Sequence, residues 1–412
     1  MLSSLHSRRL CNGSLRQKLS SAVLTPAAET RHGAYGHVLV EKNGGFRALQ
    51  LKKINGVPTV NRRSLVDVRE HVEWWDENFM VNVSVLNGDG EHFCGGLDVA
   101  GLRGVDQEQV KDCLAALCDV VTALNRSKTP AVCVLDGACV GSGYALAMGK
   151  YKFATENSTF HVPEATLGLG LAGGLSYVLP RLLGGNQPLG LFLALTGMAL
   201  EGPDLLLTQI ATNYMTHRRL EMMSDRLAEI NQDPKPFGDL TPDCSEDPTS
   251  VQMTLELSGD LSWNIDGLPA ESLDPPESQI PITPFINDIL PQVEQVFTVA
   301  SVEGAIDNLK GRSEPWAQMA LQNIGRSSPL SLKVIFEQVK RGGGMSLQEC
   351  LDEEFSVNTH LFGLPDFEAA MQARESGGGT PPWKCGSMES VSADQVAAVF
   401  DASRRPKHVA DV

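Results

Sequence analysis

Apolar positions in the first half of the chain switch repeatedly between strand spacing and helix spacing. Alternation over residues 37–51, with Asn43-Gly44 in the middle, predicts a β-hairpin. Helical spacing follows over Leu65 to Phe79, and the apolar run from Val81 to Leu86 predicts a strand. The same alternation then continues with a helix over 107–125, a strand over 131–135 and a helix after Gly143. Short strands that alternate with helices predict an α/β fold.

The second half of the chain has a different pattern. From Phe285 to Phe400 the spacing is mostly helical, and the clearest helices are expected over 333–340, 347–360 and 366–374. Together with the changes in composition, this pattern divides the chain into five parts. They are a leader (1–28), a core (33–230), an acidic insertion (231–282), a helical part of the same fold (283–384) and a polar tail (385–412).

The insertion differs from its surroundings in charge. Residues 231–280 hold eleven acidic side chains against one basic side chain, Lys235, and are rich in Pro, Ser and Asp. Such a segment cannot bury enough apolar surface to fold alone, so it is interpreted as a disordered surface insertion. A partner-docking segment is the alternative, and Trp263 and Ile265 within it favour that alternative.

The first 28 residues have the composition of a mitochondrial transit peptide. They contain Arg8, Arg9, Arg16 and Lys18 and five serines by residue 20, and no acid precedes Glu29. Transit peptides are basic, Ser-rich and poor in acids, so the mitochondrial matrix is the expected location. An untargeted tail is the alternative.

Overall composition narrows the classes of function. The 412 residues carry a net charge of −16, which disfavours a general nucleic-acid binder because phosphate contacts need Lys and Arg. No apolar run reaches the ~18 residues of a membrane span. The nine cysteines form no C-x-x-C pair, which indicates reduced, mostly buried thiols and no metal site. Cys94 is interpreted as a packing residue.

Two glycine turns and one carboxylate carry the candidate chemistry. The turns, around Gly96 and Gly141, lie about 45 residues apart, and Glu164 comes after them, next to Pro163. Glycine lets backbone N–H groups approach a ligand oxygen, and two such donors form an oxyanion hole. A carboxylate in an apolar setting should have a raised pKa, which suits acid–base chemistry. A solvated surface Glu is the alternative.

At these residues the chain resembles the crotonase (enoyl-CoA hydratase/isomerase) superfamily, and within it the 3-hydroxyisobutyryl-CoA hydrolase branch. Residues 93–98, Phe-Cys-Gly-Gly-Leu-Asp, match the family's Phe-Cys-Ala-Gly-x-Asp turn, and residues 141–143 match its Gly-Gly-Gly turn. Three later segments support the hydrolase branch. They are Leu195-Thr196-Gly197 with Gly202-x-Asp204 and Ile210-Ala211-Thr212, Ser328-Pro329-x-Ser331-Leu332-Lys333, and Asp366-Phe367-Glu368 followed by Pro382-Trp383-Lys384.

The resemblance implies a crotonase-type spiral of ββα units with a helical C-terminal region. It implies that the amides of Leu97 and Ser142 hold a thioester oxygen, and that Glu164 attacks the acyl carbon or activates water against it. The positions that it places along the substrate are Gly96, Asp98, Gly141, Gly143 and Ala172. Coenzyme A would enter as part of the substrate, with no permanently bound cofactor and no metal. A homo-oligomer is also implied, since members often form trimers.

The chain departs from the family pattern at four places, one of which is an acidic position in the family's helix before the second turn that falls near Ala116-Leu117. Hydratases carry a second Glu where this chain has Ala145, which argues against addition of water across a double bond. The hydrolase branch carries an Asp where this chain has Ala172, and losing a group that takes part in proton transfer typically costs ~10²–10⁴-fold in rate. The family's Asp-Lys-Asp near the C-terminus is replaced by residues 375–377, Glu-Ser-Gly.

The sequence supports three interpretations. The first is a mitochondrial acyl-CoA thioester hydrolase of the 3-hydroxyisobutyryl-CoA type, acting in valine breakdown. The second is a catalytically retired homologue that serves as a structural protein of the mitochondrial ribosome small subunit, with ribosomal proteins as partners. The third is an enoyl-CoA isomerase, which also works with one carboxylate. Ala172 and the acidic insertion favour the second interpretation, and the hydrolase segments favour the first.

Overall fold

The computed structural model describes residues 38–401, apart from positions 44, 54–55 and 89–90 and most of 221–284. Within that last stretch, Met223, Leu227, Leu261 and Ser262 are described. The expected transit peptide at 1–28 therefore lies outside the described residues. The acidic insertion at 231–282 also lies outside them, except for Leu261 and Ser262.

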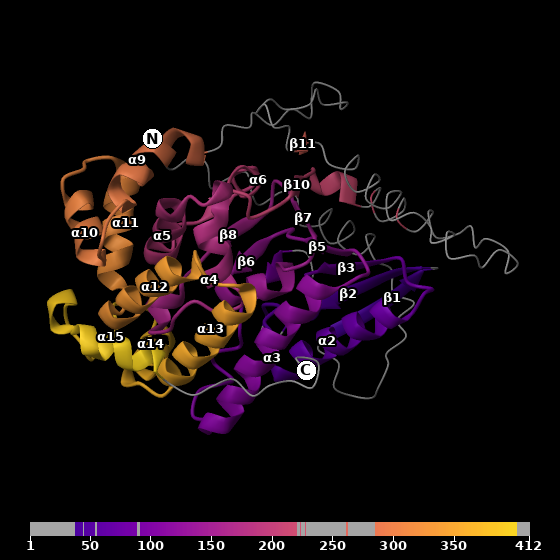
Figure 1. Ribbon diagram of the computed structural model, residues 1–412, viewed down its shortest axis with the longest axis horizontal. Coiled ribbons are helices and arrows are strands. Elements are labelled where there is room, and N and C mark those ends of the chain that lie inside the picture. Colours follow the sequence, from indigo (N-terminus) through magenta and orange to yellow (C-terminus); the bar gives the residue numbers. More distant parts are fainter. Residues whose placement is uncertain are drawn as a thin grey trace, which may run out of the picture.

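Two β-sheets form the centre of the molecule (Figure 1). The larger sheet has seven strands in the order β1-β2-β3-β5-β7-β10-β11, and the smaller sheet has four in the order β4-β6-β8-β9. In chain order the strands are β1 (Val38–Asn43), β2 (Phe46–Leu51), β3 (Val83–Asn87), β4 (His92–Cys94), β5 (Ala131–Val134), β6 (Ala138–Val140), β7 (Tyr151–Ala154), β8 (Thr159–His161), β9 (Leu200–Glu201), β10 (Asn213–Tyr214) and β11 (Leu261–Ser262).

The chain then repeats a unit of two strands followed by a helical segment, and each unit adds one strand to each sheet. The units are β3-β4 with α3 (Gln107–Arg126), β5-β6 with η1 (Gly141–Ala147), and β7-β8 with η2 (Glu164–Leu167). Neighbouring strands from successive units pair in parallel, as β3 does with β5 and β4 does with β6. The carboxyl ends of β4 and β6 therefore meet at one edge of the smaller sheet, and this edge carries both glycine turns.

The predicted elements of the N-terminal half are confirmed. The hairpin is antiparallel, with Asn43 opposite Phe46, and α2 (Arg62–Glu77) is amphipathic with Leu65, Val68 and Val72 buried. Asn61 begins this helix by accepting the N–H groups of residues 63 and 64. The helix predicted after Gly143 is a 3₁₀ helix, η1, and it begins two residues earlier, at Gly141.

Between the sheets and the C-terminal region, short segments change direction often. These segments are α4 (Leu175–Val178), η3 (Leu179–Gly184), α5 (Gln187–Thr196), α6 (Asp204–Leu207) and η4 (His217–Arg219). Of these, α5 is buried along nearly its whole length. Phe192 on α5 contacts Phe297 and Trp316 edge-on, so this helix joins the core to the C-terminal region.

The C-terminal region is helical, as predicted. It comprises α9 (Phe285–Phe297), α10 (Val302–Lys310), α11 (Pro315–Arg326), α12 (Pro329–Gly342), α13 (Leu347–Phe362), α14 (Pro365–Glu375), η6 (Met388–Ser390) and α15 (Ala393–Phe400). These helices gather at one side of the sheets (Figure 1). The expected polar tail contains α15, whose Val399 is buried in a cluster with Val334 and Val357.

Candidate functional site

The two glycine turns come together because β4 and β6 are neighbouring parallel strands. Gly96 has φ +88°, and a Cβ there would lie 3.0 Å from the carbonyl oxygen of Val140. Gly141 has φ +49°, and a Cβ there would lie 1.9 Å from Oε1 of Glu164. Both positions therefore require glycine, on grounds of conformation and of space. The close approach brings the backbone N–H groups of Leu97 and Ser142 to the same site.

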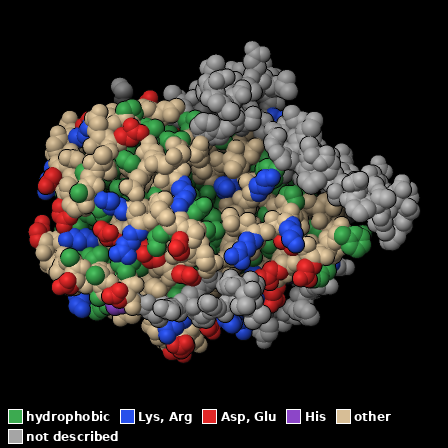
Figure 2. Space-filling model, in the orientation of Figure 1, with side chains coloured by type: hydrophobic (Ala, Val, Ile, Leu, Met, Phe, Trp, Pro, Cys, Tyr) green, Lys and Arg blue, Asp and Glu red, His purple; other side chains and the backbone are tan. Residues whose placement is uncertain are grey.

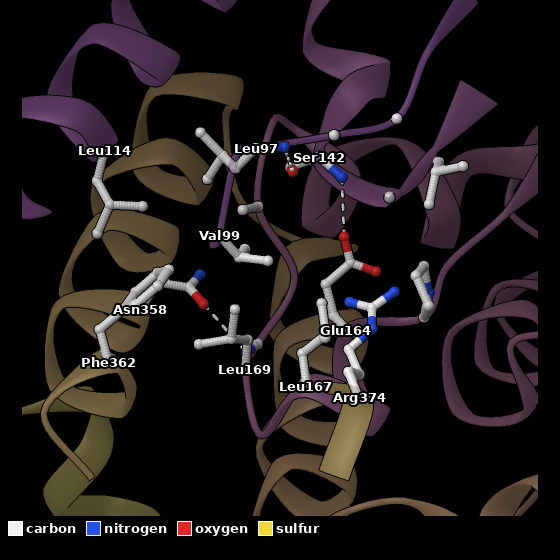
Figure 3. A pocket seen from close by; sticks show the side chains of 17 residues that line it. Leu97, Val99, Leu114, Ser142, Glu164, Leu167, Leu169, Asn358, Phe362 and Arg374 are labelled. Atoms are coloured by element: carbon white, nitrogen blue, oxygen red, sulfur yellow. Dashed lines mark hydrogen bonds between the residues drawn. The ribbon is translucent and has the colours of Figure 1, made fainter. Parts of the chain in front are cut away.

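Both predicted oxyanion donors are hydrogen-bonded within the protein (Figure 3). The N–H of Leu97 donates to Oγ of Ser142 at 3.1 Å. The N–H of Ser142 donates to Oε1 of Glu164 at 2.8 Å. The Ser142 hydroxyl therefore occupies one predicted oxyanion donor, and the Glu164 carboxylate occupies the other.

Glu164 is buried at the start of η2, with 5% of its surface exposed. Burial raises the pKa of this carboxyl to about 7, against the opposing effect of the hydrogen bond from the Ser142 amide. Its second oxygen, Oε2, is buried and has no hydrogen-bond partner among the described residues. A carboxyl in this state can exchange a proton near neutral pH, which suits it to general acid–base chemistry.

The site opens on a small cavity of about 70 Å³. Its lining includes five of the predicted residues: Gly96, Leu97, Gly141, Ser142 and Glu164. Ala172 also lines it, so the position where the hydrolase branch carries Asp does face the cavity. Of the described residues in this lining, Glu164 is the only acidic one. A cavity of this size holds a few water molecules or a small acyl group, far less than the ~300–1,000 Å³ of typical ligand pockets.

Two predicted substrate-binding residues lie outside this lining and have structural contacts. Asp98 accepts the N–H of Gly101 through Oδ1 at 3.1 Å, so it shapes the turn after Leu97. Gly143 packs against Cys94, and a Cβ there would lie 2.8 Å from the Cys94 carbonyl oxygen.

Three buried polar side chains hold the glycine-rich loop at residues 168–174, which carries Ala172. Asn358 accepts the Gly170 N–H at 3.0 Å, and Gln338 accepts the Leu171 N–H at 2.8 Å. Glu354 accepts the N–H groups of residues 174 and 176, both at 2.8 Å, and the hydroxyl of residue 176 at 2.7 Å. Burial raises the pKa of Glu354. The C-terminal helices therefore position one wall of the site.

These three residues were not predicted from the sequence, although α13 contains a signal for two of them. Glu354 and Asn358 are four residues apart on the predicted helix and lie among apolar positions such as Leu351 and Phe355. A polar pair with this spacing on an otherwise apolar face indicates buried hydrogen bonding to another segment.

The rest of the lining comes from distant parts of the chain. Its remaining apolar side chains include Val99, Leu114, Leu167, Leu169 and Phe362. Arg374, from the end of α14, is exposed and reaches the lining on the side of Glu164 (Figure 3). Arg103 is not among these lining residues, and its guanidinium forms ion pairs with Glu368 and Glu375.

The seven described cysteines are buried, as predicted. Burial raises the pKa of Cys94 to about 12, which makes it a poor nucleophile at neutral pH. Across the described ranges, no group of three or more His, Cys, Asp or Glu side chains could hold a metal ion. No helix in the described part of the chain is long and apolar enough to cross a membrane.

The sequence model of the enoyl-CoA hydratase/isomerase family matches residues 47–400, and the chain therefore belongs to this family. A mitochondrial 3-hydroxyisobutyryl-CoA hydrolase from Xenopus laevis is 28% identical over 374 residues, which cover 89% of each chain. Small ribosomal subunit protein mS47 from Arabidopsis thaliana is 26% identical over 381 residues, which cover 88% of this chain and 84% of that protein.

Solved structures of similar shape confirm the crotonase-type fold. A carnitinyl-CoA dehydratase from Mycobacterium thermoresistibile has a TM-score of 0.73 at 21% identity, covering 90% of this chain and 97% of that chain. An enoyl-CoA hydratase from Rhodobacter sphaeroides has a TM-score of 0.72 at 19% identity, covering 90% of this chain and all of that chain. At these identities the likeness concerns the fold alone.

Proposed function

We propose that this protein is an acyl-CoA thioester hydrolase of the 3-hydroxyisobutyryl-CoA type in the mitochondrial matrix, with Glu164 as its catalytic group. The observation that carries the proposal is the state of this carboxyl. It is buried, its pKa is raised to about 7, and it lies 2.8 Å from an amide that can hold an oxyanion. The similarity to the Xenopus laevis hydrolase over 374 residues supports the choice of substrate class.

The reaction requires one group that moves a proton and one site that holds negative charge. In the general-base route, the Glu164 carboxylate takes a proton from water, and the water oxygen bonds to the acyl carbon. The charge that forms on the thioester oxygen is held by the amides of Leu97 and Ser142. When the carbon–sulfur bond breaks, the proton passes from Glu164 to the leaving thiolate. In the nucleophilic route, a Glu164 carboxylate oxygen bonds to the acyl carbon, the carbon–sulfur bond breaks and the thiolate leaves, which gives a mixed anhydride. Water then cleaves the anhydride, which restores the Glu164 carboxylate and releases the acid, and a proton from this water ends on the thiolate.

Substrate entry must exchange the internal hydrogen bonds for new ones. The thioester oxygen displaces Ser142 Oγ from the Leu97 amide and Glu164 Oε1 from the Ser142 amide. Leaving that amide turns the carboxylate away from the donors, so that it can face the acyl carbon. Coenzyme A is needed only as part of the substrate, and the proposal includes no permanently bound cofactor.

A structural protein of the mitochondrial ribosome small subunit is the second candidate. Alanine at position 172 supports it, since Glu164 is then the only acid among the described residues that line the cavity. The internal bonds on both donors support it as well, because a retired site has no need to keep its donors free. The similarity to Arabidopsis thaliana mS47 gives this candidate its partner class, mitochondrial ribosomal proteins.

The test is release of free thiol from 3-hydroxyisobutyryl-CoA, with Glu164→Gln as the matched variant. Gln keeps the size of the side chain and an oxygen for the Ser142 amide but cannot move the proton. We expect turnover of ~1–10³ s⁻¹ in the native protein, lowered at least ~10²-fold in the variant. Isomerase activity is assayed separately with a 3-enoyl-CoA, whose conversion to the 2-enoyl-CoA releases no thiol and is followed by ultraviolet absorbance.

No thiol release above that of the variant, from protein with a native circular-dichroism spectrum, would reject the hydrolase. The structural candidate is tested by sedimentation of mitochondrial extracts. Comigration with the small ribosomal subunit, unchanged by Glu164→Gln, is its expected result.

A further inference from the structure

A second and larger cavity lies away from the candidate active site. Its volume is about 490 Å³, and it is lined by the end of α3 with the loop after it, the start of β7, and the α4–η3 segment. It shares no lining residue with the cavity at Glu164. We call this cavity the basic groove, after four of its lining residues, Lys128, Lys150, Lys152 and Arg181.

The charge of the basic groove is opposite to that of the chain. Among the residues that the structure describes, no Asp or Glu lines it, although the protein has a net charge of −16. None of its four basic side chains forms an ion pair with a carboxylate of the described residues. Lys and Arg side chains gather around apolar ones near the middle of the face in Figure 2. Unneutralised cations around one hollow favour an anionic ligand.

Hydrogen bonds to carbonyl oxygens hold the Arg181 side chain in place but do not neutralise its positive charge. Its guanidinium donates to the carbonyl oxygens of Tyr177 and Gly342, both at 2.7 Å, and of Met345 at 2.6 Å. It also stacks on the Tyr177 ring, 3.8 Å from the ring centroid. Carbonyl partners orient the side chain and leave its full positive charge beside the groove.

Lys152 is half-buried at the base of the groove, where its Nζ donates to the Gly149 carbonyl oxygen at 3.3 Å. Burial lowers the pKa of this ammonium. A half-buried cation without a carboxylate partner among the described residues is costly, and a bound anion would offset that cost. Lys128 and Lys150 are exposed beside it, so they can reach a ligand without rearrangement of the core.

The other wall of the basic groove is apolar, so it suits the flat face of a ring better than a second charged group. It is formed by the apolar side chains Leu124, Pro130, Met148, Val178 and Leu182. Gln209 also lines the groove and has φ +66°, a left-handed conformation that is uncommon for residues other than glycine. Its amide and that of Asn125 can recognise the polar edge of a ring.

We propose that the basic groove binds a nucleotide, with the phosphates on Lys128, Lys150 and Lys152 and the base against the apolar wall. A volume of about 490 Å³ lies within the ~300–1,000 Å³ of small-ligand sites and exceeds what a free phosphate ion needs. The cations surround one cavity, which favours a single small ligand over a long polyanion.

The proposal does not depend on hydrolase activity. The groove and the Glu164 cavity are lined by different residues, so either can fail without the other. ADP is the probe, titrated into the full chain by calorimetry, with adenosine as the ligand that lacks phosphate. The test variant is Lys128→Glu with Lys150→Glu, because both side chains are exposed and the fold should tolerate the change.

The matched control is Lys310→Glu with Lys340→Glu, which makes the same change in net charge outside the groove. We expect ADP to bind the native protein and the control alike, and adenosine to bind neither. Each reversed lysine should weaken ADP binding about tenfold or more, since each removes a charge-assisted contact.

Three results, the first two of them from the ADP titrations, would overturn the proposal. The first is no heat of ADP binding to the native protein at millimolar concentration, and the second is equal binding to both double variants. The third is binding of a single-stranded RNA that the groove variant abolishes and ADP does not compete, which would make the groove a polynucleotide surface. A Glu164→Gln sample titrated in parallel should bind ADP normally, whatever its effect on thioester hydrolysis.

Discussion

Ser142 has two opposing roles in the candidate site. Its backbone N–H is one of the oxyanion donors, while its hydroxyl occupies the other donor, Leu97, at 3.1 Å. The Gly-Gly-Gly turn that residues 141–143 resemble has no side chain at this position, whereas this chain has a hydroxyl there. A substrate oxygen must therefore compete with a hydrogen bond already present, and such bonds contribute about 0.5–1.5 kcal/mol net.

The first prediction concerns Ser142→Ala. The Leu97 N–H loses its internal acceptor, so hydrogen–deuterium exchange in the peptide that contains it should become faster. If the protein is a hydrolase, kcat/KM should stay level or rise a few-fold, up to the ~10-fold that 1.4 kcal/mol represents. Ser331→Ala is the control, because that buried hydroxyl has no hydrogen-bond partner among the described side chains and backbone. A loss of activity beyond tenfold in folded Ser142→Ala would show that the hydroxyl assists the reaction.

The second prediction concerns Glu164 and pH. The pKa of this carboxyl rises from 4.5 to about 7 on folding, so the folded protein holds the proton over a range in which the unfolded chain releases it. Its contribution to stability is therefore greatest below about pH 4.5 and is lost as the pH rises through 7. Glu164→Gln should gain stability relative to the native protein between about pH 5.5 and 8, on the order of 1–3 kcal/mol.

Thermal unfolding of the native protein and of Glu164→Gln, each at about pH 5.5 and about pH 8, measures this difference in stability. Glu349→Gln is the control, because hydrogen bonds from Ser346 lower the pKa of Glu349 and place its titration below this range. A difference between native and Glu164→Gln protein that stays constant with pH would mean that Glu164 is ionised and well solvated in the folded state.

At the scale of elements, the glycine-rich loop depends on helices that lie far away in sequence. Glu354 on α13 accepts hydrogen bonds from the Gly174 N–H of this loop and from the N–H and hydroxyl of Ser176, in the helix α4 that follows it, at 2.7–2.8 Å. Removing the carboxylate leaves three buried donors without acceptors, and each unsatisfied group costs about 1–3 kcal/mol. The loop carries Ala172, so its displacement would also change the cavity at Glu164.

The third prediction is that Glu354→Ala lowers the free energy of unfolding by about 2–5 kcal/mol. Glu337→Ala on α12 is the control. Glu337 is 42% exposed and pairs only weakly with Arg341, so its loss should change stability by less than about 0.5 kcal/mol. Chemical denaturation of the three proteins checks both values. Equal stability of Glu354→Ala and the control would show that solvent or other groups satisfy the loop.

Elements differ in how far the sequence could predict them. Long amphipathic helices such as α2 and α3 could be predicted within a few residues, since each buries one periodic stripe. The segments η1, η2 and η3 could not be predicted as 3₁₀ helices, because they are too short for periodicity to appear. The glycine turns could be predicted because close backbone approach demands glycine. The internal bond from Leu97 to Ser142 could not, because it joins residues 45 positions apart.

At the scale of the whole molecule, the division into a core and a helical C-terminal part does not correspond to two hydrophobic cores. One cluster of buried side chains contains Leu117, Phe160 and Phe192 together with Phe297 and Phe355. Phe192 on α5 contacts Phe297 and Trp316 with ring centroids 5.6 Å and 6.0 Å apart. Aromatic side chains bury large apolar areas, so these contacts bind the two parts strongly.

The fourth prediction concerns the cooperativity of this shared core. The full chain should unfold in one transition, seen at the same temperature by far-ultraviolet circular dichroism and by tryptophan fluorescence. Trp75 lies on the N-terminal side of the core and Trp316 on the C-terminal side, so fluorescence reports on both. Phe192→Ala, which removes both aromatic contacts, should cost about 3–5 kcal/mol and still give a single transition.

A fragment of residues 33–230 tests the same dependence from the other direction. It should lack fixed tertiary structure, because separating it exposes the buried face of α5 and leaves the loop at 168–174 without its acceptors on α12 and α13. Two separate transitions in the native chain, or a fragment with sharp thermal unfolding, would instead mean that the strands and their helices form a self-sufficient unit. The C-terminal helices would then line the site without being required for the N-terminal part to fold.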